Sequence, residues 1–276
     1  MTAPIRLVLI GASGRMGRSI LRALPGFPQF ELAAAIVSPG SSTLGLSCEE
    51  LAGTAPGGNV QPGALRTTAD LAAGLAGAGL AIDFSGAAAV AANVSACTEA
   101  RVPLLLGTTG YAQSLKPALE LAATRIPLLV AANTSLGVTV LLELVRRAAR
   151  DLPAGFDIEI SEAHHRDKID APSGTALALG AVARAARGAG PEGLPSIRGT
   201  GSHGSRGAGD IGYAVTRGGD LVGEHAVHFI GAGERLSLSH VATDRAIFAR
   251  GALSAGAWLA RQGPGAYRMG DAVGEK

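Results

Sequence analysis

Short apolar runs alternate with helix-type stretches over the first half of the chain. Residues 5–10 form an apolar run, interrupted only by Arg6 and closed by glycine, which predicts a strand buried on both faces of a parallel sheet. The pattern recurs at residues 30–37, 80–84, 103–107 and 126–131, with helix-type stretches at residues 15–24, 87–100 and 114–124. This alternation predicts βα units wound around a parallel sheet, as in a Rossmann-like, doubly wound domain.

The pattern changes after an apolar helix predicted at residues 136–152. Strand-type runs follow at residues 156–162, 211–217, 224–230 and 235–240. Because short turns join the last three runs, we expect them to be antiparallel. Further helices are predicted at residues 176–187 and 245–260, and the Gly-, Pro-, Ser- and Arg-rich residues 188–209 favour a mobile surface loop.

These elements predict an α/β protein with two domains. A Rossmann-like, doubly wound parallel sheet domain for dinucleotide binding takes residues 1–135 and 241–276. A second α+β domain with an open mixed sheet, for substrate binding and oligomerisation, takes residues 136–240. The chain is long enough for each domain to bury its own core.

Composition and charge exclude several classes of protein. The 276 residues are 47% hydrophobic and 17% charged, which is typical of globular proteins. A formal net charge of +2 without a long basic run argues against a nucleic-acid partner, and no apolar run reaches the roughly 18 residues of a membrane span. Cys48 and Cys97 are too few for a disulfide framework, so we expect a cytoplasmic protein.

Glycines follow the first predicted strand, where a helix is predicted to begin. The segment reads Gly11-Ala12-Ser13-Gly14-Arg15-Met16-Gly17. Such glycines permit a tight turn and close approach of the backbone to a pyrophosphate, which a helix N-terminus attracts. The spacing GxxGxxG is weak alone, and glycines that serve only packing are the alternative. Gly107-Thr108-Thr109-Gly110 and Ala131-Ala132-Asn133-Thr134 also follow predicted strands, at the sheet edge where open α/β sheets bind ligands.

The densest polar chemistry lies at residues 159–176, between a predicted strand and a predicted helix. Adjacent histidines that leave a strand point in different directions, so of His164 and His165 one can transfer protons while the other binds substrate. Lys168 adds a cationic proton donor within the same loop. The segment therefore predicts a catalytic centre that handles protons.

The helix start that ends this cluster favours anion binding. Backbone N–H groups near Gly174, with the Thr175 hydroxyl, can take a substrate carboxylate. One alternative is a solvated polar loop in which Ser173 or Thr175 is a plain helix cap. A zinc site is a second alternative, but the segment has neither HExxH nor a Cys/His set with tetrahedral spacing, so we expect no metal.

Residues 159–176 resemble the signature of the 4-hydroxy-tetrahydrodipicolinate reductase family. That signature reads E, apolar, any, E, any, H, three residues, K, any, D, any, PSGTA, and every fixed position is filled here. The resemblance extends to residues 11–17, 107–110, 131–133, 223–225 and 240–258, so it spans almost the whole chain.

The resemblance implies reduction by NADPH or NADH of a cyclic dicarboxylate in diaminopimelate and lysine biosynthesis, by a homotetramer joined through its second domains. It implies that His164 is the catalytic acid/base residue, that Lys168 is the proton donor and that His165 binds substrate. Gly174 and Thr175 would hold a substrate carboxylate. The residues that would line the cofactor are Gly11, Ala12, Ser13, Gly14, Arg15, Met16, Gly107, Thr108, Thr109, Ala131, Ala132, Asn133 and Thr134.

The chain departs from the family pattern where the adenosine ribose is expected. Many members have an acidic residue at the end of the second strand, often followed by arginine, but this chain has Val37 and Ser38. Some members place an arginine after the third strand, where this chain has Gly86. A carboxylate would bind the ribose 2′-hydroxyl of NADH and repel the 2′-phosphate of NADPH. Without it we expect both cofactors to work.

Alternative functions remain at this point. A semialdehyde dehydrogenase of similar architecture needs a nucleophilic cysteine beside a histidine, whereas Cys48 falls in a predicted loop and Cys97 inside a predicted helix. A non-catalytic dinucleotide-sensing protein would need the first domain only. The presence of His164 and Lys168 favours turnover over sensing.

Overall fold

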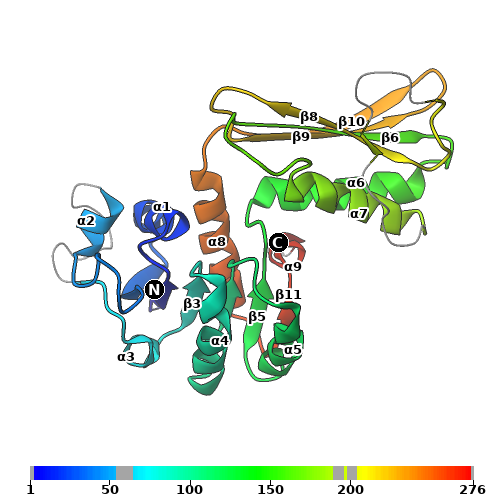
Figure 1. Ribbon diagram of the computed structural model, residues 1–276. Helices are drawn as coiled ribbons and strands as arrows, with labels where there is room; N and C mark the ends of the chain where they lie inside the picture. The colour runs from blue at the N-terminus through cyan, green and yellow to red at the C-terminus, as the bar shows by residue number, and fades with distance from the viewer. Residues whose placement is uncertain (1–2, 54–64, 189–195, 198–203, 275–276) are drawn as a thin grey trace. The chain divides into compact units, whose positions relative to one another are not determined.

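A computed structural model describes residues 3–53, 65–188, 196–197 and 204–274. The chain divides into two compact units (Figure 1). Unit 1 comprises Met1–Leu136 and Ala246–Lys276, and unit 2 comprises Gly137–Arg245. Most of the loop predicted at residues 188–209 lies outside the described residues.

Unit 1 is built on a six-stranded parallel sheet with the strand order β11-β5-β4-β3-β1-β2. The strands are β1 (Ile5–Ile10), β2 (Phe30–Ile36), β3 (Leu80–Asp83), β4 (Leu104–Leu106), β5 (Pro127–Val130) and β11 (Gly265–Tyr267). The predicted doubly wound sheet is thereby confirmed. The edge strand β11 was not predicted, because its three residues, Gly-Ala-Tyr, have no apolar run.

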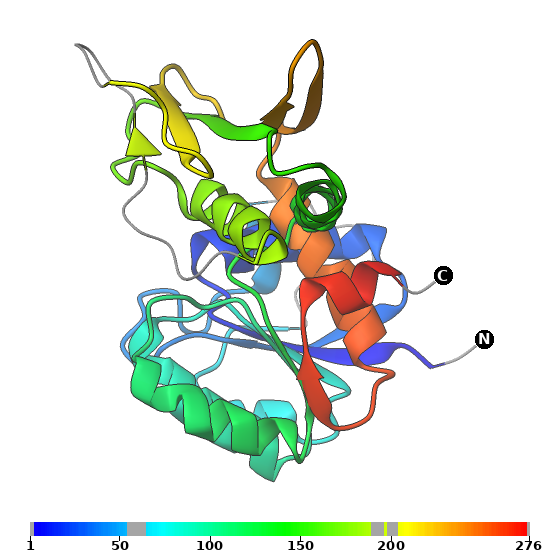
Figure 2. The same cartoon turned by 90° about the vertical axis from the view of Figure 1, so that its right-hand side faces the viewer.

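Helices cover both faces of this sheet (Figure 2). They are α1 (Arg15–Ala23), η1 (Leu24–Gly26), α2 (Cys48–Ala52), α3 (Leu71–Leu75), η2 (Ala87–Ala89), α4 (Val90–Glu99), η3 (Gln113–Leu115), α5 (Lys116–Ala123), α8 (Ala246–Leu259) and α9 (Met269–Gly274). In β1, Leu7 and Leu9 join one buried cluster with residues of α1 and α8, while Val8 and Ile10 join another with residues of α4. This alternation explains why the strand is apolar at every position from Leu7 to Ile10.

Unit 2 contains a five-stranded mixed sheet with the order β10-β9-β6-β8-β7. Its elements are α6 (Leu136–Asp151), β6 (Asp157–His164), α7 (Gly174–Ala186), β7 (Ser196–Ile197), β8 (Ile211–Arg217), β9 (Gly223–Ile230) and β10 (Arg235–Ala242). The predicted open mixed sheet is confirmed, and β8, β9 and β10 run in alternating directions, as expected. β9 and β10 are neighbours in the sheet, whereas β6 lies between β8 and β9, parallel to β8 and antiparallel to β9.

Both long helices of unit 2 lie against the same face of its sheet (Figure 1). Alternate residues of β6 point to that face, and Ile158 and Ile160 pack there with residues of α6 and α7. The same alternation places Glu162 and His164 on the covered face at the carboxyl end of the strand. The hydrophobic core therefore gives way to polar residues at this end of β6.

Candidate functional site

In the glycine segment of unit 1, residues 11–17, the backbone approaches other backbone atoms too closely for a side chain to fit between them. Gly11 has a φ of +82°, and a Cβ there would lie 2.5 Å from the Phe84 carbonyl oxygen. A Cβ at Gly17 would lie 2.3 Å from the Gly11 carbonyl oxygen. Gly14 is the N-cap of α1 and has no side-chain cap, so the first N–H groups of this helix are presented without a competing side chain.

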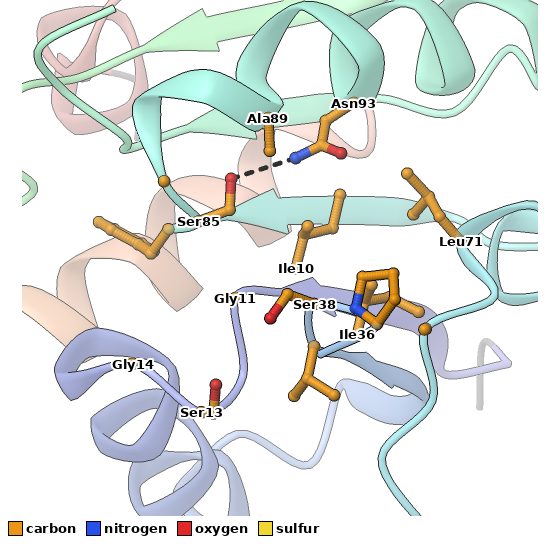
Figure 3. Close-up of a pocket in the computed structure, with 15 residues that line it drawn as sticks. Ile10, Gly11, Ser13, Gly14, Ile36, Ser38, Leu71, Ser85, Ala89 and Asn93 are labelled. Atoms are coloured by element: carbon orange, nitrogen blue, oxygen red, sulfur yellow. Dashed lines mark hydrogen bonds between the residues drawn. The ribbon is translucent and has the colours of Figure 1, made fainter. Parts of the chain in front are cut away.

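A cavity of about 400 Å³ opens beside this segment (Figure 3). The predicted cofactor residues that line it are Gly11, Ser13, Gly14, Val37 and Ser38. Gly86, where some family members have an arginine, also lines it. Sequence reasoning missed the other lining residues, which are Ile10, Ile36, Pro39, Ala69, Leu71, Phe84, Ser85, Ala89 and Asn93. Every lining residue is uncharged, and the polar side chains among them are Ser13, Ser38, Ser85 and Asn93.

A buried polar network supports one wall of this cavity. The Asp83 side chain is fully buried at the end of β3 and accepts hydrogen bonds from Ser85 N (2.7 Å), Asn93 Nδ2 (2.9 Å) and Thr108 Oγ1 (3.1 Å). Asn93 Nδ2 also donates to Ser85 Oγ at 3.1 Å (Figure 3). The network ties the ends of β3 and β4 to α4.

The remaining predicted cofactor residues do not line this cavity: Ala12, Arg15, Met16, Gly107, Thr108, Thr109, Ala131, Ala132, Asn133 and Thr134. Thr108 is buried in the network just described, and Thr134 Oγ1 donates to the Phe248 carbonyl of α8 at 2.7 Å. Thr109 and Ala132 are exposed at the carboxyl ends of β4 and β5. The two buried threonines therefore hold the strand ends, while their neighbours face outward.

In unit 2, Glu162 is the centre of the polar cluster. Its side chain is 1% exposed, and Oε2 lies 2.6 Å from His164 Nδ1. Arg217 of β8 donates to both carboxylate oxygens at 2.8 Å, and Ser173 N donates to Oε1 at 3.0 Å. One buried carboxylate thus joins β6, β8 and the start of α7.

Protonation states in this cluster follow from burial and hydrogen bonding. Burial alone would raise the pKa of Glu162, but the hydrogen bonds from Arg217, His164 and Ser173 outweigh it and lower the pKa. Burial lowers the pKa of His164, and the Glu162 carboxylate offsets this only in part. An ionised carboxylate only accepts hydrogen bonds, so the neutral His164 carries its proton on Nδ1 and has a lone pair on Nε2.

The loop after β6 holds the other candidate catalytic residue. Lys168 Nζ forms a bidentate ion pair with the Asp170 carboxylate, at 2.7 and 2.8 Å. This ion pair lowers the pKa of Asp170. Arg217 donates to the backbone carbonyls of Lys168 (3.3 Å) and Asp170 (2.6 Å), so it connects this loop to Glu162. His165 is half-buried, next to this loop.

Ser173 caps α7, as one of the alternative readings of the sequence allowed. Its Oγ accepts from Ala176 N at 3.2 Å and lies 3.1 Å from Nε2 of His225 in β9. Gly174 is exposed, and a Cβ there would meet no atom within 4 Å. Thr175 is half-buried. The predicted carboxylate-binding pair thus begins a helix whose cap belongs to the same cluster.

Sequence reasoning assigned no role to Glu162, Arg217 or His225. Glu162 had a recognisable signal, because residues two apart in a strand share a face and His164 follows at that spacing. Arg217 had none, since the hydrogen bonds to Glu162 span 55 residues of sequence. His225 contacts His164 through a T-shaped ring pair with centroids 5.1 Å apart.

The structure also bears on the zinc and cysteine alternatives. Within the described part of the chain, no group of three or more His, Cys, Asp or Glu side chains is arranged to hold a metal ion. Cys48 begins α2 rather than lying in a loop, and Cys97 lies in α4 as expected. Both thiols are buried, which raises the pKa of Cys48 to about 11 and that of Cys97 to about 12. Neither is a nucleophilic thiolate.

Models of one protein family match both halves of the chain. The model described as dihydrodipicolinate reductase, N-terminus, matches residues 5–134, and that for the C-terminus matches residues 137–273. The 4-hydroxy-tetrahydrodipicolinate reductase of Anaeromyxobacter dehalogenans strain 2CP-1 is 43% identical, with 98% of this chain and 97% of the relative covered. That of Rhodopseudomonas palustris strain BisB18 is 45% identical with the same coverage.

A solved structure is similar over almost the whole length. The dipicolinate-bound dihydrodipicolinate reductase of Paenisporosarcina sp. TG-14 superposes with a TM-score of 0.75 at 22% identity, covering 96% of this chain and 97% of that chain. At this identity the similarity shows the fold. Among the described residues, no helix has the length and apolarity needed to cross a membrane.

Proposed function

This chain belongs to the dihydrodipicolinate reductase family. From that premise we propose which of its residues bind the cofactor, bind the substrate and transfer protons. It is an NADPH- or NADH-dependent oxidoreductase of diaminopimelate and lysine biosynthesis. The substrate is the cyclic unsaturated dicarboxylate formed from 4-hydroxy-tetrahydrodipicolinate by loss of water, and the product is tetrahydrodipicolinate. The buried Glu162–His164 pair, joined to the Lys168 loop by Arg217, is the observation that carries the assignment of the chemistry to unit 2.

The glycine-lined cavity of unit 1 fits the dinucleotide. Gly11, Ser13 and Gly14 would hold the pyrophosphate through backbone N–H groups, and Val37 and Ser38 would contact the adenosine ribose. When bound, NADPH or NADH supplies the hydride that reduces C4 of the substrate. We assign the other predicted cofactor residues, at the ends of β4 and β5 and in the first turn of α1, to the same ligand, with Thr108 and Thr134 acting through their backbone.

In unit 2, Lys168 is the proton donor. Its ammonium is held beside the Asp170 carboxylate in the loop that Arg217 anchors. His164 is neutral with its proton directed at Glu162, so it cannot deliver a proton from Nε2 without first taking one there. We assign His164 to accepting and relaying protons at Nε2, and His165 to binding the substrate.

The start of α7 would hold one substrate carboxylate. Gly174 and Thr175 are the first two residues of this helix, whose N-terminus attracts anions, and the Ser173 hydroxyl accepts from the N–H of Ala176. Pyridine-2,6-dicarboxylate should therefore compete with substrate. Gly174→Ala should raise the inhibition constant of this compound about tenfold, because a Cβ would keep the carboxylate from the backbone N–H groups. The loss of one charge-assisted hydrogen bond costs about 1.5 kcal/mol or more.

Gly155→Ala is the matched control for this test, because a Cβ at Gly155 also meets no atom within 4 Å. It should leave inhibition unchanged. Pyridine-2-carboxylate, which lacks one carboxylate, should inhibit more weakly than the dicarboxylate. Equal inhibition by the two compounds would remove the anion pocket at α7 from the proposal.

The assembly proposed is a homotetramer joined through unit 2, in the cytoplasm. One part of the sheet face opposite α6 and α7 supports this, because small side chains and one valine gather there beside the charged Glu159 and Glu224: Ser161, Ala163, Ala214, Thr216, Ala226, Ser239 and Val241. The side chain of Val241 is 57% exposed there. Two free cysteine thiols fit a reducing compartment. Sedimentation at several protein concentrations measures the oligomer.

One experiment tests the proposed function as a whole. Purified protein should oxidise NADPH or NADH only when the product of the preceding synthase is supplied. Tetrahydrodipicolinate should form in equal amount. Nucleotide binding without turnover would favour the dinucleotide-sensing alternative. Oxidation of a semialdehyde coupled to reduction of NADP⁺ or NAD⁺ would favour a semialdehyde dehydrogenase.

A further inference from the structure

We propose that Glu162 and Arg217 are a positioning pair, which aligns the three parts of unit 2 on which the reaction depends. These parts are the His164 imidazole, the loop that holds Lys168, and the start of α7. The inference rests on the proposed function, because it concerns the same site. It assigns roles to two residues that need not touch the substrate.

The first observation is that the Glu162 carboxylate is saturated with donors. It receives hydrogen bonds from His164 Nδ1, from both terminal nitrogens of Arg217 and from Ser173 N, at 2.6 to 3.0 Å. Its 1% exposure excludes competition from bulk water. A carboxylate with this set of partners stays ionised and fixes each donor in position.

The second observation is that Arg217 extends this arrangement to the Lys168 loop. Besides its fork to Glu162, the guanidinium donates to the carbonyls of Lys168 and Asp170. Its side chain is 18% exposed. Five N–H donors in a rigid plane can serve a carboxylate and two carbonyls together, whereas a lysine ammonium offers three donors at one point.

These contacts have a consequence for proton transfer. Because the Nδ1–H group of His164 donates to Glu162, the lone pair on its Nε2 is the available proton acceptor. With the loop carbonyls held by Arg217, Lys168 stays on the same side of the sheet end as His164. Replacing Glu162 by glutamine would let an amide N–H donate to Nδ1, which would move the imidazole proton to Nε2.

The test uses Glu162→Gln, Arg217→Lys and the double variant in the full chain. Matched controls are Glu159→Gln and Arg206→Lys, because Arg206 and Glu159 form an ion pair on the same strand, on the opposite face of the sheet. Each single variant of the positioning pair should lower kcat about 10- to 100-fold, the scale found for groups that orient a functional imidazole. The double variant should lose no more than the worse single variant, because the pair acts as one unit.

Two further readouts distinguish positioning from a general loss of structure. Binding of NADPH, which occupies unit 1, should be unchanged in every variant that keeps its thermal unfolding transition. The Nδ1 proton of His164 should give a hydrogen-bonded NMR resonance in the wild type and in Glu159→Gln, but not in Glu162→Gln. The NMR measurement needs no turnover, so it still tests the pair if the proposed reaction fails.

The proposal is overturned by either of two results. One is a kcat for Glu162→Gln and Arg217→Lys within twofold of their controls. The other is an Nδ1 resonance that survives in Glu162→Gln. If Glu162→Gln does not fold, Glu162→Asp replaces it, because aspartate keeps the charge on a shorter side chain. A kcat above the Arg217→Lys value but below that of the wild type would support positioning. A wild-type kcat would contradict it.

Discussion

The cavity of unit 1 and the polar cluster of unit 2 differ in the charge of the residues that form them. The cavity is lined by uncharged residues, and one of them, Gly11, makes a close backbone contact with Phe84. The cluster contains an ionised carboxylate, a guanidinium, an ammonium and an imidazole within one network. A large ligand is bound by shape and backbone donors, whereas proton transfer needs side chains whose charge states are set by neighbours. Steric changes should therefore damage the first region and charge changes the second.

The largest effect should come from the ammonium of Lys168. Lys168→Ala should lower kcat about 10²- to 10⁴-fold while leaving NADPH affinity unchanged, because general acid catalysis contributes on that scale and the residue belongs to unit 2. Steady-state kinetics and fluorescence titration with NADPH measure the two quantities. Lys116→Ala, at an exposed position of α5, is the control. A kcat within about twofold of the control would move the proton donor to His164 or to water.

Steric damage to unit 1 should be greatest at Gly11. In Gly11→Ala, an alanine must adopt the left-handed backbone of Gly11, and its Cβ would lie 2.5 Å from the Phe84 carbonyl oxygen. The variant should therefore lower the free energy of unfolding by about 3 kcal/mol and abolish dinucleotide binding. Urea unfolding and NADPH titration measure both. Gly26→Ala, where a Cβ meets nothing within 4 Å, should change neither. Equal stability of the two variants would refute the steric account.

Charge burial in unit 2 should make its stability depend on pH through His225. Burial lowers the pKa of His225 from 6.5 to about 4, an effect to which His164 adds and which Glu162 opposes. Between these values the unfolded chain binds the proton and the folded chain does not. Stability should therefore be complete above pH 6.5 and fall by about 3 kcal/mol as the pH drops to 4.

His225→Gln isolates this contribution, because glutamine keeps a donor for Ser173 but does not titrate. The urea midpoint of the variant should vary less between pH 7 and pH 4.5 than that of the wild type. His228→Gln, at a half-buried position of the same strand whose Nδ1 lies 2.9 Å from Ser237 Oγ, should retain the wild-type dependence. Identical pH profiles for all three proteins would show that His225 titrates normally.

The smallest effect concerns the choice of cofactor in the uncharged cavity. With Val37 and Ser38 at the end of β2, the wild type should use both cofactors, with NADPH equal or somewhat better. Ser38→Arg should raise the preference for NADPH about tenfold, since one charge-assisted contact to the 2′-phosphate is worth about 1.5 kcal/mol or more. Ratios of kcat/KM measure the preference. Ser42→Arg, exposed and outside the cavity, is the control.

A carboxylate at Val37 should shift the ratio in the opposite direction. Val37 is 3% exposed and belongs to the core of unit 1, so Val37→Asp will also cost stability and its ratio must be measured on folded protein. A strong NADH preference in the wild type would contradict this account. No shift in either variant would mean that the adenosine ribose lies elsewhere.

Much of the fold was predictable because it depends on local apolar patterns. The runs at residues 5–10 and 80–84 end at glycine or at polar residues, and each is a strand of the parallel sheet. Pairing order is a different matter. The strands at residues 211–217 and 224–230 are neighbours in sequence, but β6 lies between them. Consecutive strands pair often but not always, so the order of strands in a sheet depends on contacts between distant segments.

The sequence by itself determined the doubly wound sheet, the second mixed sheet, the phosphate-type glycine segment and the identity of His164 and Lys168 as candidate residues. Only the tertiary structure decided which groups set their chemistry. Arg217 reaches Glu162 across 55 residues of sequence, and the Thr108 hydroxyl faces the Asp83 carboxylate rather than the cavity. The physical reason is that a motif specifies residue types at short spacing, whereas hydrogen bonding and desolvation depend on distances that exist only after the strands have paired.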